Sequence, residues 1–133
     1  MHEKFRVSTT LPAADFERAK LWYKDKLGLS PVWEREGAGA YFECAEGTGF
    51  LLYPTSFGGK AENTAMGMEV TDIDHVVGDL KSKGVEFLEY DSPPLVTENS
   101  IATLGPIRGA WFKDSEGNII GVTDWGPEGR PKS

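Results

Sequence analysis

The sequence has little of what several functional classes require: one cysteine, two histidines and no run of basic residues among 133 positions. Because Cys44 stands alone, no internal disulfide can form, which fits a reducing compartment and equally a disulfide-free exported protein. Lys and Arg number 14 against 21 Asp and Glu, giving a formal charge of -7 and no basic footprint for nucleic acid. No apolar stretch has the length of a membrane span, and the charged first residues differ from a signal peptide. We therefore expect a cytoplasmic protein that binds neither nucleic acid nor membrane.

The first half of the chain reads as one strand, one helix and further strands. Hydrophobic residues make up 39% of the chain, enough for a single domain core. Apolar and polar residues alternate from Phe5 to Thr10, which predicts a half-buried strand. Asp15 can cap a helix whose apolar residues recur at helical spacing up to Leu27, and Gly28 ends it. Three strand candidates follow: Pro31 to Arg35, Ala40 to Ala45, and Phe50 to Tyr53.

The second half repeats this order. Residues alternate again from Met66 to Val70, Asp72 stands at a helix start, and Gly84 closes the helix. Asp15 and Asp72 are 57 positions apart, and the two helix-ending glycines are 56 apart, so the halves agree within one residue. We therefore predict an α+β domain of two tandem βαβββ modules, at about residues 5–55 and 64–125, with a flexible tail at 126–133.

The rest of the second module is predicted as strands around a long loop. Val85 to Tyr90 reads as a strand, and the segment from Asp91 to about Arg108 reads as a loop. This loop is a candidate lid over a binding site, although it could equally close one end of the sheet or contact a dimer partner. Two final strands, Gly109 to Lys113 and Asn118 to Asp124, are joined by a turn that contains Gly117.

Two segments carry a family resemblance: D-F-E-R-A-K-L-W-Y-K-D-K-L-G-L from Asp15, and G-A-W-F-K-D-S-E-G-N-I-I from Gly109. In this order they resemble the vicinal oxygen chelate superfamily, which includes glyoxalase I, extradiol dioxygenases, fosfomycin-modifying enzymes and bleomycin-binding resistance proteins. The likeness covers about residues 5–125 and is not specific for one activity. It implies two half-barrels that form a central cleft, and a homodimer.

The resemblance also implies where a metal would bind. Metal-dependent members place His, Gln or Glu ligands on the first and fourth strands of each module, because a divalent ion needs several converging donors. Those positions correspond here to Ser8, about Leu52, Ala65 and Gly121. None is a usual metal ligand, except that Ser8 could bind weakly. We therefore expect no metal and no other cofactor.

Other possible ligands are scattered along the chain. His2 and His75 are interpreted as surface residues, since one is terminal and the other lies on the polar side of its helix. Glu43, Glu69 and Asp124 would hold a hard cation only if the fold gathered them. Single carboxylates on strands are more often solvated or paired.

Strand alternation sorts the side chains by face. One set is predicted to pack beneath the helices: Val7, Met66, Met68, Val70, Phe112, Ile120 and Val122. The opposite set faces the cleft and supplies the ligand-binding candidates: Arg6, Ser8, Phe50, Leu52, Glu69, Trp111, Lys113, Gly121 and Thr123. Apolar residues with a few polar groups are typical of a small-molecule site.

Several candidates also fit purely structural roles. Trp111 could stack on a flat or cationic ligand, or it could be a core or dimer-interface aromatic. Arg6 and Glu69 could recognise a ligand or form a cross-strand ion pair. The small residues Ala65 and Gly121 leave room for a ligand or for close backbone packing.

Three functions stay open on these residues. The favoured hypothesis is a metal-free protein that binds a small cationic or aromatic molecule, since the chain is acidic and the predicted cleft carries Trp111. The alternatives are a lyase or isomerase acting on a small metabolite, and a dimeric protein without small-molecule chemistry. The missing ligands argue against a metal-dependent lyase or dioxygenase, and no catalytic residue can be named.

Overall fold

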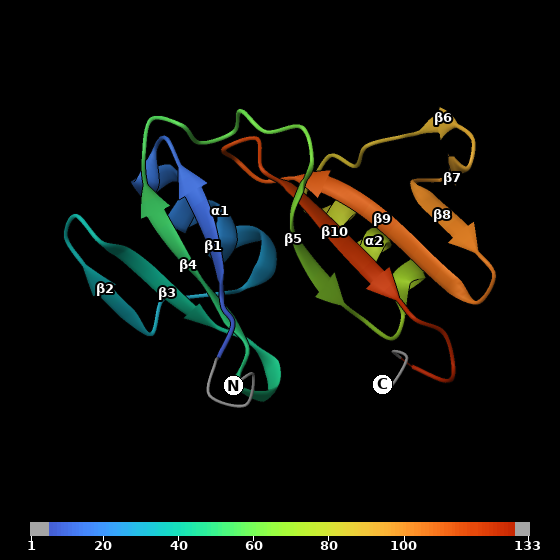
Figure 1. Cartoon of the computed structure of the whole chain (residues 1–133), viewed down its shortest axis with the longest axis horizontal. Helices are drawn as coiled ribbons and strands as arrows, with labels where there is room; N and C mark the ends of the chain where they lie inside the picture. The colour runs from blue at the N-terminus through green and yellow to red at the C-terminus, as the bar shows by residue number, and fades with distance from the viewer. Residues whose placement is uncertain (1–5, 130–133) are drawn as a thin grey trace. The chain divides into compact units, whose positions relative to one another are not determined.

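The computed structural model describes residues 6–129, which form two compact units (Figure 1). One unit holds the described residues up to Lys60 together with Ser115–Asn118, and the other holds Ala61–Asp114 and the residues from Ile119 onward. Each unit contains one α-helix and one mixed sheet, and the first also has a short 3-10 helix, η2 (Ala45–Gly47). The prediction of an α+β protein with two βαβββ modules is confirmed.

The first unit is built on a four-stranded sheet in the order β1-β4-β3-β2. β1 runs parallel to β4, whereas the other neighbours are antiparallel. Its elements are β1 (Thr9–Ala13), α1 (Phe16–Leu27), β2 (Trp33–Arg35), β3 (Gly39–Glu43) and β4 (Gly49–Pro54).

Helix α1 begins and ends where local chemistry predicts. The Asp15 carboxylate accepts a hydrogen bond from the Arg18 backbone N–H at 3.1 Å, and Gly28 follows the helix with φ of 69°. Tyr23 of α1 is fully buried, with ring centroids 5.9 Å from Phe42 and 5.2 Å from Phe50. These three rings form the centre of the first unit's core, because aromatic side chains bury large apolar areas.

The predicted first strand is placed wrongly. Phe5 lies outside the described residues, Val7 is 96% exposed, and β1 begins only at Thr9. The buried positions of β1 are Leu11 and Ala13. Pro12 does not end the strand, because β1 pairs with β4 alone and a proline is tolerated on an edge strand.

The second unit is built on a six-stranded sheet in the order β5-β10-β9-β8-β7-β6. β5 runs parallel to β10, and the other pairs are antiparallel. Its elements are β5 (Thr64–Glu69), α2 (Ile73–Ser82), β6 (Asp91–Ser92), β7 (Leu95–Glu98), β8 (Ile101–Leu104), β9 (Ile107–Lys113) and β10 (Ile119–Asp124).

Helix α2 covers one face of this sheet. Asp72 caps it by accepting a hydrogen bond from the His75 backbone N–H at 3.3 Å, as the internal repeat predicts. Figure 1 shows α2 behind β9 and β10, and the helix contacts both strands. The buried side chains beneath it include Phe112, Ile120 and Val122, so the predicted inward face of these strands is confirmed. His75 is exposed.

Two element predictions in the second unit are wrong. The segment Val85 to Tyr90 forms no strand, although Phe87 makes an isolated bridge to Phe112. The predicted loop from Asp91 to Arg108 instead contains β6, β7 and β8 and the start of β9, so it extends the sheet. The turns at Pro93-Pro94 and Asn99-Ser100 contain no glycine, and only the turn before β9 has one, Gly105, so glycine spacing does not mark these strands in the sequence.

Neither helix has the length and hydropathy for a membrane span in the described part of the chain: α1 has 12 residues and α2 has 10. His2 and the last four residues of the predicted tail lie outside the described range.

Candidate functional site

On the face of the second sheet opposite α2, Trp111 is the central side chain. Its neighbours Ala110 and Phe112 on β9 are fully buried on the α2 side, so Trp111 projects from the opposite face. Gly121 of β10 lies directly across from Trp111, and Gly67 of β5 lies across from Gly121. Across the adjacent strands β5, β10 and β9, the indole of Trp111 therefore lies in one row with two glycines, which have no side chain.

The indole lies close against the sheet. A Cβ added to Gly121 would stand 3.4 Å from Nε1 of Trp111, and one added to Gly109 would stand 3.4 Å from Cη2. Both atoms belong to the edge of the indole that carries the nitrogen, so this edge spans the two glycine positions. A Cβ at either position would already be in van der Waals contact with the ring, so a side chain longer than that of alanine would have to displace the indole. The glycines thus allow the indole its position.

Tyr90 closes one flank of the indole. Its ring centroid is 5.4 Å from that of Trp111, and the ring planes meet at 85°, an edge-to-face contact. The Tyr90 backbone is paired with Thr97 of β7: the Tyr90 N–H donates to Thr97 Oγ1 at 2.9 Å, and the Thr97 N–H donates to the Tyr90 carbonyl at 2.8 Å. We call Tyr90 and Trp111 the aromatic corner.

Polar side chains stand on either side of this corner. Thr123 of β10 lies opposite both Gly109 and Glu69, so Glu69 and Thr123 share the face of Trp111. Lys113 follows Trp111 by two residues on β9 and has the same orientation. Glu69 and Lys113 are exposed, and Thr123 is half-buried. The structure thus brings together five of the predicted ligand-binding residues: Glu69, Trp111, Lys113, Gly121 and Thr123.

The four predicted residues of the first module lie elsewhere. Phe50 and Leu52 are 2% and 0% exposed and belong to the core under α1, so their predicted orientation toward a cleft is wrong. The run Phe50 to Tyr53 is apolar throughout and contains no alternation that could mark the buried face. Arg6 and Ser8 are exposed and precede β1, so neither is part of the sheet.

Residues outside the predicted ligand-binding set lie on the outward face of the first sheet. Tyr41 and Leu51 are directly paired on β3 and β4, and both are half-buried. Tyr53 has the same orientation as Leu51, since the two are separated by one residue. The sequence does not show which face Tyr41 and Leu51 occupy, because Phe42 and Phe50, on the opposite face, are apolar as well. The pairing register identifies the two faces.

The family's metal positions do not fit a metal ion in this chain. Leu52 is buried in the core, and Ser8 precedes the first strand. At Gly121 a carboxylate side chain would meet the Trp111 indole. Within residues 6–129, no three His, Cys, Asp or Glu side chains are grouped closely enough to hold a metal ion. Ser8, Leu52 and Gly121 therefore provide no side chains suited to coordinate a metal ion.

The suggested carboxylate cluster does not form within the second unit. Asp124 Oδ2 accepts a hydrogen bond from the Ile73 N–H of α2 at 3.4 Å, which places this carboxylate on the helix side of the sheet. Glu69 pairs with Thr123 and therefore has the opposite orientation. The two carboxylates point to different faces and cannot chelate one ion.

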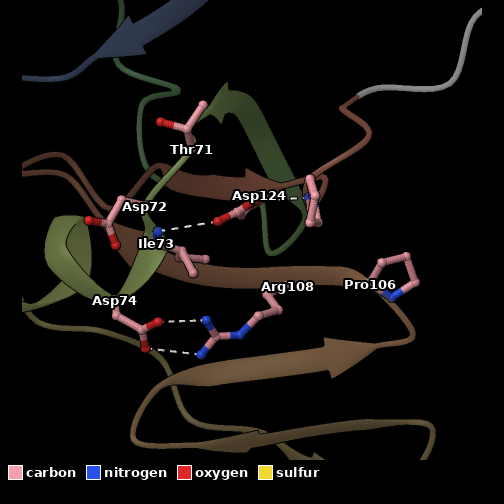
Figure 2. A pocket seen from close by; sticks show the side chains of 9 residues that line it. Thr71, Asp72, Ile73, Asp74, Pro106, Arg108 and Asp124 are labelled. Carbon is pink, nitrogen blue, oxygen red and sulfur yellow. Dashed lines mark hydrogen bonds and ion pairs between the residues drawn. The ribbon is translucent and has the colours of Figure 1, made fainter.

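An open pocket of about 510 Å³ lies at the start of α2, on the helix side of the second sheet (Figure 2). It is lined by Thr71, Asp72, Ile73, Asp74, Pro106, Arg108, Asp124, Gly126 and Pro127.

The charged groups of this pocket bind one another. Figure 2 shows the Arg108 guanidinium donating to both Asp74 oxygens, at 2.6 and 3.0 Å. The hydrogen bonds from Arg108 hold the pKa of Asp74 below its ordinary value. Asp124 Oδ1 accepts from the Gly126 N–H at 2.9 Å. None of the predicted ligand-binding residues lines this pocket.

The comparisons with known proteins agree with this architecture. The family model described as the Glyoxalase/Bleomycin resistance protein/Dioxygenase superfamily matches residues 7–122. No curated protein sequence matches the chain significantly.

Three solved structures illustrate the range of similar proteins. A glyoxalase/bleomycin resistance protein from Catenulispora acidiphila is 20% identical, with a TM-score of 0.66 over 91% of this chain and 98% of that one. TnmS3, an antibiotic binding protein from a Streptomyces species, is 20% identical, with a TM-score of 0.61 over 91% and 97%. The fosfomycin resistance protein FosX from Listeria monocytogenes, in complex with Mn(II), is 13% identical, with a TM-score of 0.67 over 92% and 90%. By the extent of the family match and the fold it shares with these proteins, the chain belongs to the glyoxalase/bleomycin resistance protein/dioxygenase superfamily.

Proposed function

We propose that this protein binds a small planar molecule without the help of a metal ion, and that the ligand stacks on Trp111. The observation that carries the proposal is the position of the indole, which lies against Gly109 and Gly121 and meets Tyr90 at its edge. Trp111 is half-buried, so part of its surface is accessible to a partner. An aromatic surface fixed in this way stacks on a flat ligand at little cost in side-chain entropy.

The charge of the chain favours a cationic ligand. The formal charge is -7, and the exposed Glu69 carboxylate shares the face of Trp111. A tryptophan face also attracts cations through its ring quadrupole, by about 0.5–2 kcal/mol. TnmS3 is named as an antibiotic binding protein, and this similarity supports small-molecule binding as the shared theme. Homodimerisation and a cytoplasmic location are part of the same proposal and stay predictions from the sequence.

A thermal-shift screen with cationic planar dyes tests the proposal. A ligand at about 100 times its Kd stabilises the native state by about 2.7 kcal/mol, which raises the melting temperature by several degrees. The variant Trp111→Ala should lose the shift for the compounds that stabilise the wild type. Trp33→Ala is the matched control, because Trp33 is 47% exposed and lies on β2 of the first unit.

Two results would overturn the proposal. Either no planar compound raises the melting temperature, or Trp111→Ala binds the active compounds as tightly as the wild type in titration calorimetry. Loss of binding in Trp33→Ala, with binding retained in Trp111→Ala, would move the site to the first unit.

A further inference from the structure

Glu89 connects three donors of the β7–β8 hairpin to the segment that carries Tyr90. Its Oε1 accepts hydrogen bonds from the Thr97 hydroxyl at 2.8 Å and from the Ser100 N–H at 3.1 Å. Its Oε2 accepts from the Ser100 hydroxyl. Ser100 is fully buried, so its polar groups need protein partners, and Glu89 supplies the acceptors.

The turn that Glu89 binds has an unfavourable backbone. Glu98 pairs with Ile101, which leaves Asn99 and Ser100 as a two-residue hairpin turn with φ of 51° and 75°. In two-residue turns with positive φ at both positions, Asn suits the first position and glycine the second, so Asn99 fits, whereas Ser100 stands where a side chain is strained. The hydrogen bonds from Ser100 to Glu89 offset that strain, and so the turn depends on Glu89.

The same carboxylate is connected to Tyr90 through one hydroxyl. The Thr97 hydroxyl accepts a hydrogen bond from the Tyr90 N–H at 2.9 Å and donates its proton to Glu89 Oε1 at 2.8 Å. The Thr97 N–H in turn donates to the Tyr90 carbonyl. Glu89, Tyr90 and Thr97 thus close a ring of hydrogen bonds directly beside the aromatic corner.

The charge state of Glu89 favours its hydrogen bonds to Thr97 and Ser100. The pKa of Glu89 lies below its ordinary value, chiefly because the hydroxyls of Ser100 and Thr97 donate to it, and Lys81 adds a favourable charge. The ionised carboxylate accepts from all three donors through charge-assisted hydrogen bonds, whereas a protonated one is a weaker acceptor and carries a donor of its own.

We propose that Glu89 is a positioning residue for the aromatic corner: through Thr97 and Ser100 it holds Tyr90 at the flank of Trp111. Tyr90 covers that flank, so Glu89 also limits a stacked ligand to the remaining part of the indole. The second statement rests on the proposed function, since it takes Trp111 as the stacking surface. The first concerns the protein without ligand and can be tested alone.

Fluorine NMR of protein labelled with 5-fluorotryptophan tests the position of the indole directly. The resonance of Trp111 is assigned by its disappearance in Trp111→Phe. In Glu89→Ala this resonance should shift or broaden, because Tyr90 is no longer held against the ring, while the Trp22 and Trp33 resonances of the first unit stay in place. Glu89→Gln keeps one acceptor oxygen and should restore a spectrum close to that of the wild type.

Two further variants make the test decisive. Glu86→Ala removes an exposed carboxylate three residues earlier in the same segment and should leave the Trp111 resonance unchanged. Thr97→Val removes the hydroxyl between Glu89 and the Tyr90 N–H with almost no change of shape, and β-branched residues suit a strand. Thr97→Val should shift the Trp111 resonance as Glu89→Ala does. If Glu89→Ala does not fold, Thr97→Val alone tests the positioning role.

Ligand titration separates this inference from the proposed function. With a dye that stabilises the wild type, Glu89→Ala should bind about tenfold more weakly and discriminate less between narrow and wide ring systems. An unchanged Trp111 resonance in Glu89→Ala and Thr97→Val would overturn the positioning role, whether or not a ligand is found. A shifted resonance in a protein that binds no planar compound would uphold the positioning role and refute the proposed function.

Discussion

The Arg18 guanidinium and the Glu116 carboxylate are bonded at two points, Nε to Oε2 at 2.8 Å and Nη2 to Oε1 at 3.2 Å. Glu116 Oε1 also accepts from the Asp15 N–H at 2.7 Å. The Glu116 side chain is fully buried, whereas that of Arg18 is 58% exposed. The turn between β9 and β10 therefore supplies a negative charge at the start of α1, where the helix dipole favours it.

This contact predicts a pH-dependent stability. Burial raises the pKa of Glu116, but the hydrogen bonds from Arg18, the Asp15 N–H and Ser115 together lower it below the ordinary 4.5. Because the folded-state pKa is depressed, the contribution is complete above the unfolded-state pKa and is lost as pH falls through the folded-state value. We expect Glu116→Gln to reduce the free energy of unfolding by about 2 kcal/mol at neutral pH.

Urea unfolding across the acid range checks this prediction. The difference between the wild type and Glu116→Gln should narrow once pH falls below the pKa of an ordinary glutamate, because the unfolded chain then binds protons. It should vanish when pH has fallen through the depressed pKa of Glu116 in the folded protein. A difference that stays constant from neutral to acid pH would show that the charge of Glu116 contributes nothing.

The two helix caps predict a matched pair of destabilised variants. Asp15→Ala and Asp72→Ala each remove a carboxylate that accepts a backbone N–H of the first helical turn. Each should lower the free energy of unfolding by about 1 kcal/mol. Asp25→Ala is the control, since Asp25 is an exposed residue within α1. Equal urea midpoints for the cap variants and Asp25→Ala would contradict the capping role.

Alanine substitutions at Gly67 and Gly121, which face each other on β5 and β10, should affect stability differently. A Cβ on Gly67 has no neighbour within 4 Å, whereas a Cβ on Gly121 meets Thr64 Cγ2 at 3.3 Å and Trp111 Nε1 at 3.4 Å. Neither glycine has a positive φ. Gly67→Ala should therefore stabilise the protein by about 0.4–1 kcal/mol through the unfolded state.

Gly121→Ala should lose that gain, because its Cβ would stand 3.3 Å from Thr64 Cγ2, a tight contact that must be relieved. The Trp111 resonance should also shift, because the added methyl group lies in contact with Nε1 of the indole. The fluorine resonance of Trp111 and the urea midpoint report the two effects separately. Similar resonances and midpoints for both variants would show that the glycine at position 121 does not determine where the indole lies.

The residues at the family's metal positions predict that divalent ions do not change the melting temperature. Ser8, Leu52, Ala65 and Gly121 offer neither an imidazole nor a carboxylate. Adding Zn²⁺, Ni²⁺ or Mn²⁺ should leave the melting temperature at the value measured with a chelator present. Stoichiometric metal after purification, measured by elemental analysis, would contradict the prediction.

Local signals in the sequence predicted the helices well. Asp15, Gly28 and Asp72 act within a few residues of the bonds that they form, so their roles follow from the sequence alone. The extent of β1 did not follow from the sequence, because its continuation through Pro12 to Ala13 depends on β1 being an edge strand. Edge position is a property of the whole sheet.

The alternation of residues along β9 predicted the orientation of Trp111 but not its contacts. Trp111 stands between two residues that pack under α2, and the pattern of β9 placed it on the opposite face correctly. The contacts of Trp111 with Tyr90 and Gly121 depend on the pairing of distant strands, which no local pattern encodes. The same holds for Glu89, whose partners lie on a hairpin that the sequence presented as a loop.

The parallel pairings have a consequence for how the chain folds during synthesis. β1 pairs with β4 and β5 pairs with β10, so the opening strand of each module is joined to its closing strand. Such long-range pairing forms slowly, because a large loop must close first. We expect a nascent chain to leave β5 without its neighbour until Ile119–Asp124 has emerged from the ribosome. During that interval the unpaired edge of β5 is open to association with other chains.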